Sequence, residues 1–252
     1  MMAAANLGSH DATRIRALTA ADLPAAVALQ RQVERDLPAG FLRGKTEEEL
    51  AAYLQGHVGV AYGVCSGATL LSMALLRLPA AKHPLSGECF PFVPEADWPL
   101  RAAILEHAMV YPGARRSGYQ QALICARIAH ARRCAGVRWI CAGVQLANAA
   151  SWRNLLRSGL VIVKSRAQAG RTLLALLMSL DNAVLHTRLS DQRWVIEQDA
   201  DGHAAALRAG YIGVRPGMGG TVIYQRQSEF VRAGNDSSFG HSSLAACREG
   251  IA

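Results

Sequence analysis

The sequence predicts a mixed α/β fold in which helices cover a central sheet. Short apolar runs typical of strands alternate with segments of helical periodicity from about residue 13 to residue 180. Capping boxes and stop glycines mark several helix ends, and a Ser-Gly pair joins two β-rich runs as a hairpin. About half of the 252 residues are apolar, which suits a domain with a substantial core.

The first elements are defined by their end signals. Thr19 and Asp22 form a capping-box-like helix entry, and Thr46 with Glu49 forms a second one. We expect, in order, a strand at Thr13–Leu18, a helix from Thr19 to about Arg35, a helix from Thr46 to about Gln55, and strands at His57–Cys65 and Ala68–Leu78. Residues 79–99 hold several prolines and little periodicity, which predicts a long loop, and long loops in compact domains are often functional.

The second half of this domain alternates strands and helices. We expect a strand at Ala102–Tyr111, a helix from Gly118 to about Ala135, a strand at Val137–Val144, a helix at Asn148–Ser158, and strands at Leu160–Lys164 and Thr172–Leu180. Gly136 and Gly159 follow the two helices as stop residues. The predicted domain therefore spans residues 13–180.

The pattern of residues 181–227 predicts a C-terminal β-α-β extension that packs against this domain. Its expected elements are a strand at Trp194–Gln198, a helix at Asp201–Arg208, and a hairpin of Tyr211–Val214 and Thr221–Arg226. Residues 228–252 have the composition of a disordered tail. Leu156–Leu160 resembles Leu207–Tyr211, which indicates either two generic glycine-capped helix ends, the interpretation that we favour, or a degenerate half-repeat of the fold.

Composition narrows the possible partners. The formal net charge is +8, but the charge is scattered and almost all of it is arginine. No polybasic run with interleaved aromatics occurs, which disfavours nucleic acid. A phosphate-rich small ligand explains the local arginine pairs equally well. The six cysteines form no Cys-x-x-Cys pair, and the histidines show no metal-ligand spacing, so we expect thiols and no metal. No apolar stretch is long enough to span a membrane and no secretory signal is recognisable, which predicts a cytoplasmic protein.

Residues 110–123 carry the clearest chemical signal. They run from a strand, through a turn that contains Arg115 and Arg116, into a helix that begins near Gly118. The first N–H groups of a helix have no intrahelical acceptor, and the helix dipole makes that end electropositive. Two arginines and a glycine beside such an end predict a pyrophosphate site.

These residues resemble the coenzyme A loop of the GNAT acetyltransferase superfamily, V-x-P-x-x-(R/Q)-x-x-G-x-(G/A). Val110, Pro112, Arg115 and Gly118 match this pattern, whereas Gln120 places a larger side chain where the family has a small residue, which would tilt the pyrophosphate or narrow the loop. A second family segment, N-x-x-(A/S)-x-x-x-x-x-K-x-G-F, matches at Asn148, Ser151 and Gly159, with Arg157 and Leu160 in place of the lysine and the aromatic residue.

The resemblance implies a GNAT-type mixed sheet and an N-acetyltransferase that uses acetyl-CoA and a small-molecule or peptide amine, without a metal. The amine attacks directly in a ternary complex. The resemblance places the loop of residues 79–99 near the acceptor site, with a structural flap as the equal alternative. The extension would cover the acceptor side or form a homodimer contact. The residues that the resemblance places on the cofactor are Met109, Val110, Arg115, Arg116, Ser117, Gly118, Tyr119, Gln120, Asn148 and Ser151.

Acyl transfer to an amine needs a base for the amine and a way to release the thiolate. Glu106 is the one carboxylate in the strand before the coenzyme A loop, where family members commonly place the base; its alternative role is a solvent-facing or arginine-paired side chain. His107, expected on the opposite face of the strand, is the second candidate base. Relatives often place a tyrosine acid at the position of Leu155, so Ser151 or a distant tyrosine would have to replace it, unless the thiolate leaves unassisted.

Two further hypotheses compete with the enzyme. Gln120 and Leu155 are compatible with an acyl-CoA-binding module that has lost catalysis, and the arginine content with a nucleic-acid-binding protein. Residues 39–46 also satisfy a relaxed nucleotide-binding pattern, (G/A)-x-x-x-x-G-K-(S/T). We reject that pattern because a polar helical segment precedes it, whereas a phosphate-binding loop follows a buried strand.

Overall fold

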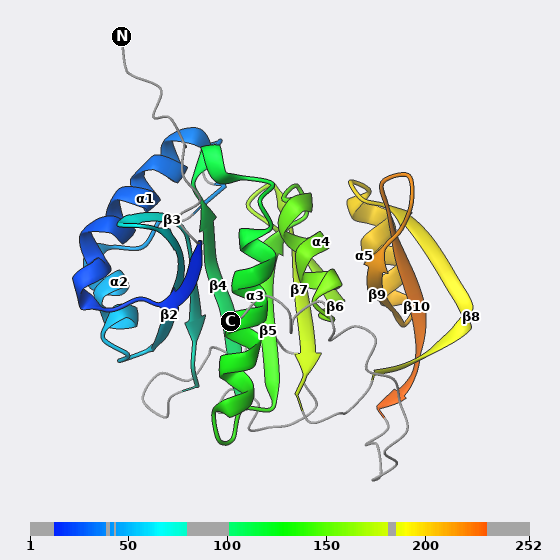
Figure 1. Cartoon of the computed structure of the whole chain (residues 1–252). Coiled ribbons are helices and arrows are strands. Elements are labelled where there is room, and N and C mark those ends of the chain that lie inside the picture. Colours follow the sequence, from blue (N-terminus) through cyan, green and yellow to red (C-terminus); the bar gives the residue numbers. More distant parts are fainter. Residues whose placement is uncertain (1–12, 39–40, 43, 80–100, 181–184, 231–252) are drawn as a thin grey trace.

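The computed structural model describes residues 13–38, 41–42, 44–79, 101–180 and 185–230, and its strands form one ten-stranded sheet (Figure 1). The strand order is β1-β2-β3-β4-β5-β7-β6-β9-β10-β8. The mixed α/β fold predicted from the sequence is confirmed. The predicted loop lies almost wholly outside the described residues.

The first four strands are antiparallel neighbours, and two helices cover one face of them (Figure 1). The strands are β1 (Arg14–Ala17), β2 (Gly59–Ser66), β3 (Thr69–Arg77) and β4 (Ala102–Val110), and the helices are α1 (Leu23–Asp36) and α2 (Glu47–Leu54). The Thr46 side chain accepts a hydrogen bond from Glu49 N at 3.2 Å, and Glu49 Oε2 accepts one from Thr46 N at 2.9 Å. This capping box confirms Thr46 as a helix cap.

The opposite face of the sheet is covered by α3 (Tyr119–Arg133) and α4 (Ala149–Arg157). The strands below them are β5 (Trp139–Gln145), β7 (Arg171–Ser179) and β6 (Val161–Gln168). Consecutive residues of a strand point to opposite faces. Accordingly, Leu75 packs in the core under α1 and α2, whereas Leu76 packs in the core with Ile124 and Trp152.

The C-terminal extension continues the same sheet. It consists of β8 (Leu185–Ile196), α5 (Ala200–Arg208), β9 (Tyr211–Pro216) and β10 (Thr221–Phe230). The strand predicted at Trp194–Gln198 begins earlier and ends at Ile196, and β10 continues to Phe230, beyond the predicted start of the tail at residue 228. The rest of that tail lies outside the described residues.

The extension repeats the unit β5-α4-β6-β7, and its equivalent elements in chain order are β8, α5, β9 and β10. In the sheet, β5-β7-β6 is followed by β9-β10-β8, which is the same order reversed. The side chains repeat as well, since Trp152 Nε1 donates to Leu146 O at 3.0 Å and the equivalent His203 Nε2 donates to Glu197 O at 3.0 Å. Asn148 and Asp199 are equivalent N-caps.

A local two-fold relationship therefore links the two units. The equivalent strands β6 and β9 pair antiparallel through Ile162 and Gly213, while α4 contacts β9 and α5 contacts β6. Gly159 and Gly210 end the two helices with φ of 90° and 82°, as glycine-capped ends do. The topology thus supports a degenerate half-repeat of the fold over the favoured interpretation of two generic glycine-capped helix ends, and β9 covers the β6 edge.

The cysteines differ in their bonding. Cys65, Cys134 and Cys141 are free thiols, as expected. Cys125 is disulfide-bonded, so the expectation of thiols throughout is wrong for this residue. Among the helices that the structure describes, none has the length and the apolar character needed to cross a membrane.

The cap of α5 gives a test of the extension's contribution to folding. Asp199 accepts a hydrogen bond from Gly202 N at 2.8 Å and satisfies a helix N–H that has no other acceptor. We predict that Asp199→Ala lowers the free energy of unfolding by about 1 kcal/mol in urea titrations. Asp201→Ala, which removes a carboxylate from the same first turn without removing the cap, is the control. Equal effects of the two substitutions would contradict this role of the cap.

Candidate functional site

A slot opens in the sheet between β4 and β5. These parallel strands pair only where Ala102, Ala103 and Ile104 face Trp139, Ile140 and Cys141. Beyond that point β4 stays with β3 and β5 stays with β7. The resulting slot, a cavity of about 290 Å³, has side chains of α3 and α4 on one side of the sheet and Phe41 and Leu42 on the other.

A β-bulge in β4 shapes this slot. The pairing of β3 with β4 shifts register between Met73 and Leu75, and His107 has a φ of 52°. An extra residue of this kind bends a strand and breaks the alternation of its side chains. Glu106 and His107 consequently line the same cavities, and the prediction that they lie on opposite faces is wrong.

Arg127 on α3 holds the backbone at this bulge. Its side chain is buried, its Nη1 donates to Leu75 O at 2.9 Å and to Glu106 O at 3.0 Å, and its Nε donates to Leu123 O at 3.0 Å. Burial lowers the pKa of Arg127 to about 9, so the guanidinium stays charged at neutral pH. Within the described part of the chain, no carboxylate forms an ion pair with it.

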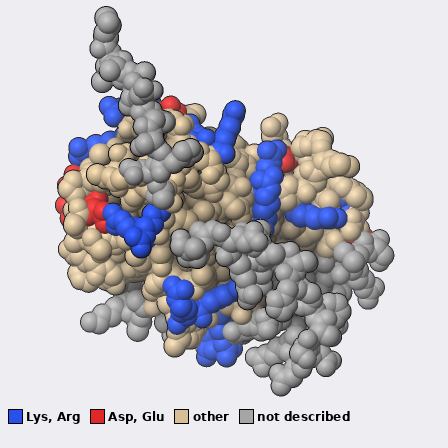
Figure 2. Space-filling view, in the orientation of Figure 1, with Lys and Arg blue, Asp and Glu red and all other residues tan. Residues whose placement is uncertain are grey.

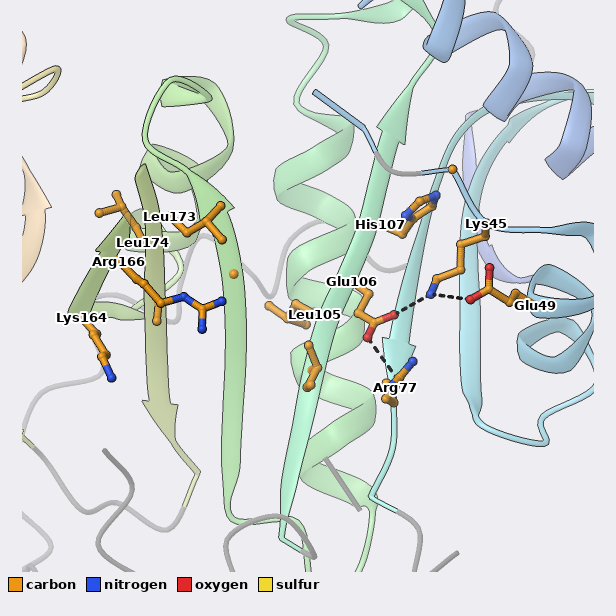
Figure 3. A pocket seen from close by; sticks show the side chains of 14 residues that line it. Lys45, Glu49, Arg77, Leu105, Glu106, His107, Lys164, Arg166, Leu173 and Leu174 are labelled. Carbon is orange, nitrogen blue, oxygen red and sulfur yellow. Dashed lines mark ion pairs between the residues drawn. The ribbon is translucent and has the colours of Figure 1, made fainter. Parts of the chain in front are cut away.

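The carboxylate of Glu106 faces a second cavity, of about 560 Å³, on the α1 and α2 side of the sheet (Figure 3). It lies 3.3 Å from Lys45 Nζ and 3.2 Å from Arg77 Nε, and it accepts a hydrogen bond from the Tyr53 hydroxyl at 2.9 Å. Burial, and then the charge of Glu106, raises the pKa of Tyr53, which keeps that hydroxyl a donor. Glu106 is thus both exposed to the cavity and paired with an arginine.

His107 is held in one tautomer. The buried Gln30 donates from Nε2 to Lys45 O at 2.9 Å, so its Oε1 is the acceptor that faces His107 Nε2 at 3.1 Å. His107 therefore donates from Nε2 and keeps the lone pair on Nδ1. Burial, and then the charge of Lys45, lowers the pKa of His107 to about 4, and the ring is neutral at pH 7.

The other wall of this second cavity comes from β6 and β7. Lys164 and Arg166 lie there beside Leu173, across from Glu106 (Figure 3). Glu106, His107, Leu105, Gly143 and Leu173 line both this cavity and the slot. The two spaces therefore adjoin at the opening between β4 and β5. We call the larger one the acceptor cavity.

The turn before α3 leaves its backbone donors unused. In the described part of the chain, the N–H groups of residues 116–121 make no hydrogen bond. Gly118 caps the helix with a φ of 78°, and Arg116 has a φ of 68°. Arg115 is instead paired with Asp36 on α1, at 2.6 Å between Nη1 and Oδ2. Ser117 is exposed in the same turn.

The remaining predicted cofactor residues divide between slot and core. Asn148 Oδ1 accepts from Ser151 N at 3.2 Å, and Gln120 Nε2 donates to Ser151 Oγ at 3.1 Å, so these three side chains meet in the slot. Leu155 lines the slot with them. The Met109 side chain is in the core under α1 and α2, and Tyr119 packs against the core formed by Val64, Ala74 and Leu123. Val110 is half-buried at the end of β4.

Comparison with solved structures identifies the architecture. A putative acetyltransferase, yncA, of Salmonella typhimurium with its cofactor acetyl-CoA matches at 20% identity and TM-score 0.51, over 68% of this chain and 95% of that one. NAA60 of Arabidopsis thaliana in complex with acetyl-CoA matches at 14% identity and TM-score 0.53, over 68% of this chain and 99% of that one. A GNAT-family acetyltransferase of Streptococcus pneumoniae matches at 15% identity and TM-score 0.52, over 66% and 98%.

The chain has the GNAT fold. No protein-family model and no curated sequence matches it. The match covers about two thirds of the chain, so roughly a third lies outside it. In the described residues, no group of three or more His, Cys, Asp or Glu side chains is placed to hold a metal ion.

Local sequence patterns indicate only some of the residues of this site. Lys45, Tyr53 and Arg77 reach Glu106 from distant segments, and no local pattern indicates that they meet. No local pattern indicates the contact between Gln30 and His107 either, because the two residues are distant in the sequence. Arg127 had a signal, since it interrupts the apolar stripe of the helix that contains Leu123, Ile124, Ile128 and Ala131.

The buried neutral His107 predicts a pH dependence of stability. A folded-state pKa of about 4 lies below the ordinary value of 6.5, so the unfolded chain binds this proton first as the pH falls. The His107 contribution to the free energy of unfolding is therefore complete above pH 6.5 and declines between about 6.5 and about 4.

We predict that His107→Gln flattens the pH profile of the free energy of unfolding in that window, measured by urea titration at each pH. His57→Gln removes an exposed histidine and serves as the control. A His107→Gln profile parallel to the wild-type profile would show that the pKa of the His107 ring is the same in the folded and the unfolded chain.

Proposed function

We propose that this chain is an N-acetyltransferase that transfers an acetyl group from acetyl-CoA to a primary amine by direct attack in a ternary complex. The observation that carries the proposal is the slot between β4 and β5, which lies between the donor-rich end of α3 and the acceptor cavity. Such an opening lets a thioester enter from one side of the sheet and an amine from the other. The structures of similar fold that contain acetyl-CoA support this assignment.

The coenzyme would lie along the α3 side. Its pyrophosphate would accept hydrogen bonds from the free N–H groups of residues 116–121, where the helix dipole and Arg116 favour an anion. Its pantetheine arm would run through the slot past Asn148 and Ser151. Arg115 would join the phosphate site if its ion pair with Asp36 opened.

The amine would attack from the acceptor cavity. Its nitrogen forms a bond to the thioester carbon, the carbon–sulfur bond breaks, and Glu106 accepts the amine proton directly or through water. Ser151 Oγ already accepts a hydrogen bond from Gln120, which leaves its own hydrogen free for the sulfur. The cavity, of about 560 Å³, is large enough for a small amine or the end of a peptide.

A second candidate function is acyl-CoA binding without turnover. The contacts of Lys45, Arg77 and Tyr53 with the carboxylate of Glu106 favour this function, because they engage both oxygens of the group that would have to accept the amine proton. Release of the coenzyme A thiol in the presence of a broad amine panel separates the two functions. Nucleic-acid binding gains no support, because Lys and Arg lie in separate groups on the face drawn in Figure 2.

Calorimetric titration with acetyl-CoA tests the cofactor site. We predict micromolar binding, about −8 kcal/mol, by the wild type. Arg116→Glu places a carboxylate beside the proposed pyrophosphate and is predicted to weaken binding more than tenfold. Arg133→Glu makes the same charge change at the other end of α3 and is predicted to leave binding within threefold of wild type. Equal losses of acetyl-CoA affinity in the two variants, or no binding by the wild type, would contradict the assignment of this loop as the pyrophosphate site.

The base is tested by Glu106→Gln. We predict a loss of about 100-fold or more in kcat for amine acetylation, because the proton acceptor is removed, while acetyl-CoA affinity stays within threefold. Glu49→Gln alters the other carboxylate near Lys45, at 3.7 Å from its Nζ, and is predicted to change kcat by less than fivefold. An unchanged kcat in Glu106→Gln would assign proton transfer to another group, with His107 Nδ1 as the next candidate.

A further inference from the structure

Arg127 brings a positive charge to the slot. Among the described residues that line the slot, it is the one lysine or arginine, and His107 beside it is neutral at pH 7. Its side chain is only 1% exposed, and its described hydrogen-bond acceptors are three backbone carbonyls. Carbonyl oxygens satisfy the N–H groups but do not neutralise the charge.

A buried cation without a counter-ion is unusual, because a buried charge is normally paired. Nη1 and Nε of Arg127 donate to the carbonyls, whereas Nη2 makes no hydrogen bond with any part of the chain that the structure describes. The guanidinium therefore attracts negative charge that develops in the slot, and the low dielectric around it strengthens that attraction.

Acyl transfer creates such a negative charge. When the amine nitrogen bonds to the thioester carbon, charge appears first on the carbonyl oxygen, and it passes to sulfur when the carbon–sulfur bond breaks. Leu155, which lines the slot, has no proton to donate to this sulfur, and the hydroxyl of Ser151 is a weak acid. Stabilisation of the thiolate by a fixed cation would remove the need for a strong proton donor.

We propose that Arg127 stabilises the coenzyme A thiolate that leaves in the transfer step. This inference rests on the proposed acetyltransferase function. The amine proton goes to Glu106, the electron pair of the broken carbon–sulfur bond stays on sulfur, and the thiolate takes a proton from water after release. The guanidinium contributes its charge and transfers no proton.

Arg127 also supports the β4 bulge, so lost activity in a variant would not by itself distinguish the two roles. The ionisation of bound coenzyme A does distinguish them, because a purely structural residue would not change it. The thiolate is measured by its ultraviolet absorbance as the pH is raised, with the complex of desulfo-coenzyme A subtracted as the blank. Arg127→Lys keeps a positive charge, and Arg127→Gln removes it.

We expect the acid dissociation constant of the bound thiol to be at least about tenfold larger than that of free coenzyme A in the wild type. Arg127→Lys is expected to retain most of this increase and Arg127→Gln to abolish it. A wild-type complex whose thiol ionises like free coenzyme A overturns the inference, even if Arg127→Gln does not fold. An increase that persists in a folded Arg127→Gln also overturns it.

These outcomes separate the inference from the proposed function. If coenzyme A binds and amines are acetylated but the bound thiol ionises like that of free coenzyme A, the chain is an acetyltransferase and Arg127 does not stabilise the thiolate. If calorimetry detects no coenzyme A binding in the wild type, both the acetyltransferase function and the role of Arg127 are wrong.

Discussion

The site depends on one constraint in β4, namely that this strand cannot follow both of its neighbours beyond Ile104. The bulge at His107 keeps β4 with β3 and separates it from β5. Bending a strand in this way leaves buried carbonyls that need partners, and Arg127 supplies donors to those of Leu75 and Glu106. The same side chain thereby keeps the slot open and brings charge to it, so architecture and proposed chemistry share one residue.

The C-terminal unit affects the site from the far edge of the sheet. Its strand β9 pairs with β6, the strand that brings Lys164 and Arg166 to the acceptor cavity. The ion pair of Arg153 with the buried Glu197 further ties α4 to the end of the repeated unit. Because the repeat meets its counterpart through equivalent strands, the extension serves as an internal partner for an edge that would otherwise be unpaired.

Local signals explain how much of this molecule could be predicted. The capping box of Thr46, the glycines at 159 and 210, and the half-motifs around Gly118 and Asn148 act within a few residues, and the elements that they define are present. The Glu106 contacts with Lys45, Tyr53 and Arg77 arise from tertiary packing, which residue spacing does not encode. The bulge reverses the expected direction of His107 because period-two alternation assumes an uninterrupted strand. Gln120, a departure from the family pattern, is held by Ser151 and Asn154, and no sequence rule would have placed it there.

The most direct measurement is a crystal structure of the protein with bound coenzyme A. We predict that the pantetheine arm lies between Ala108 of β4 and Val144 of β5, that the pyrophosphate lies on the N–H groups at the start of α3, and that the sulfur lies on the Arg127 side of Glu106. Coenzyme bound at another surface, with the slot between β4 and β5 empty, would show that this opening in the sheet is not the acyl-donor site.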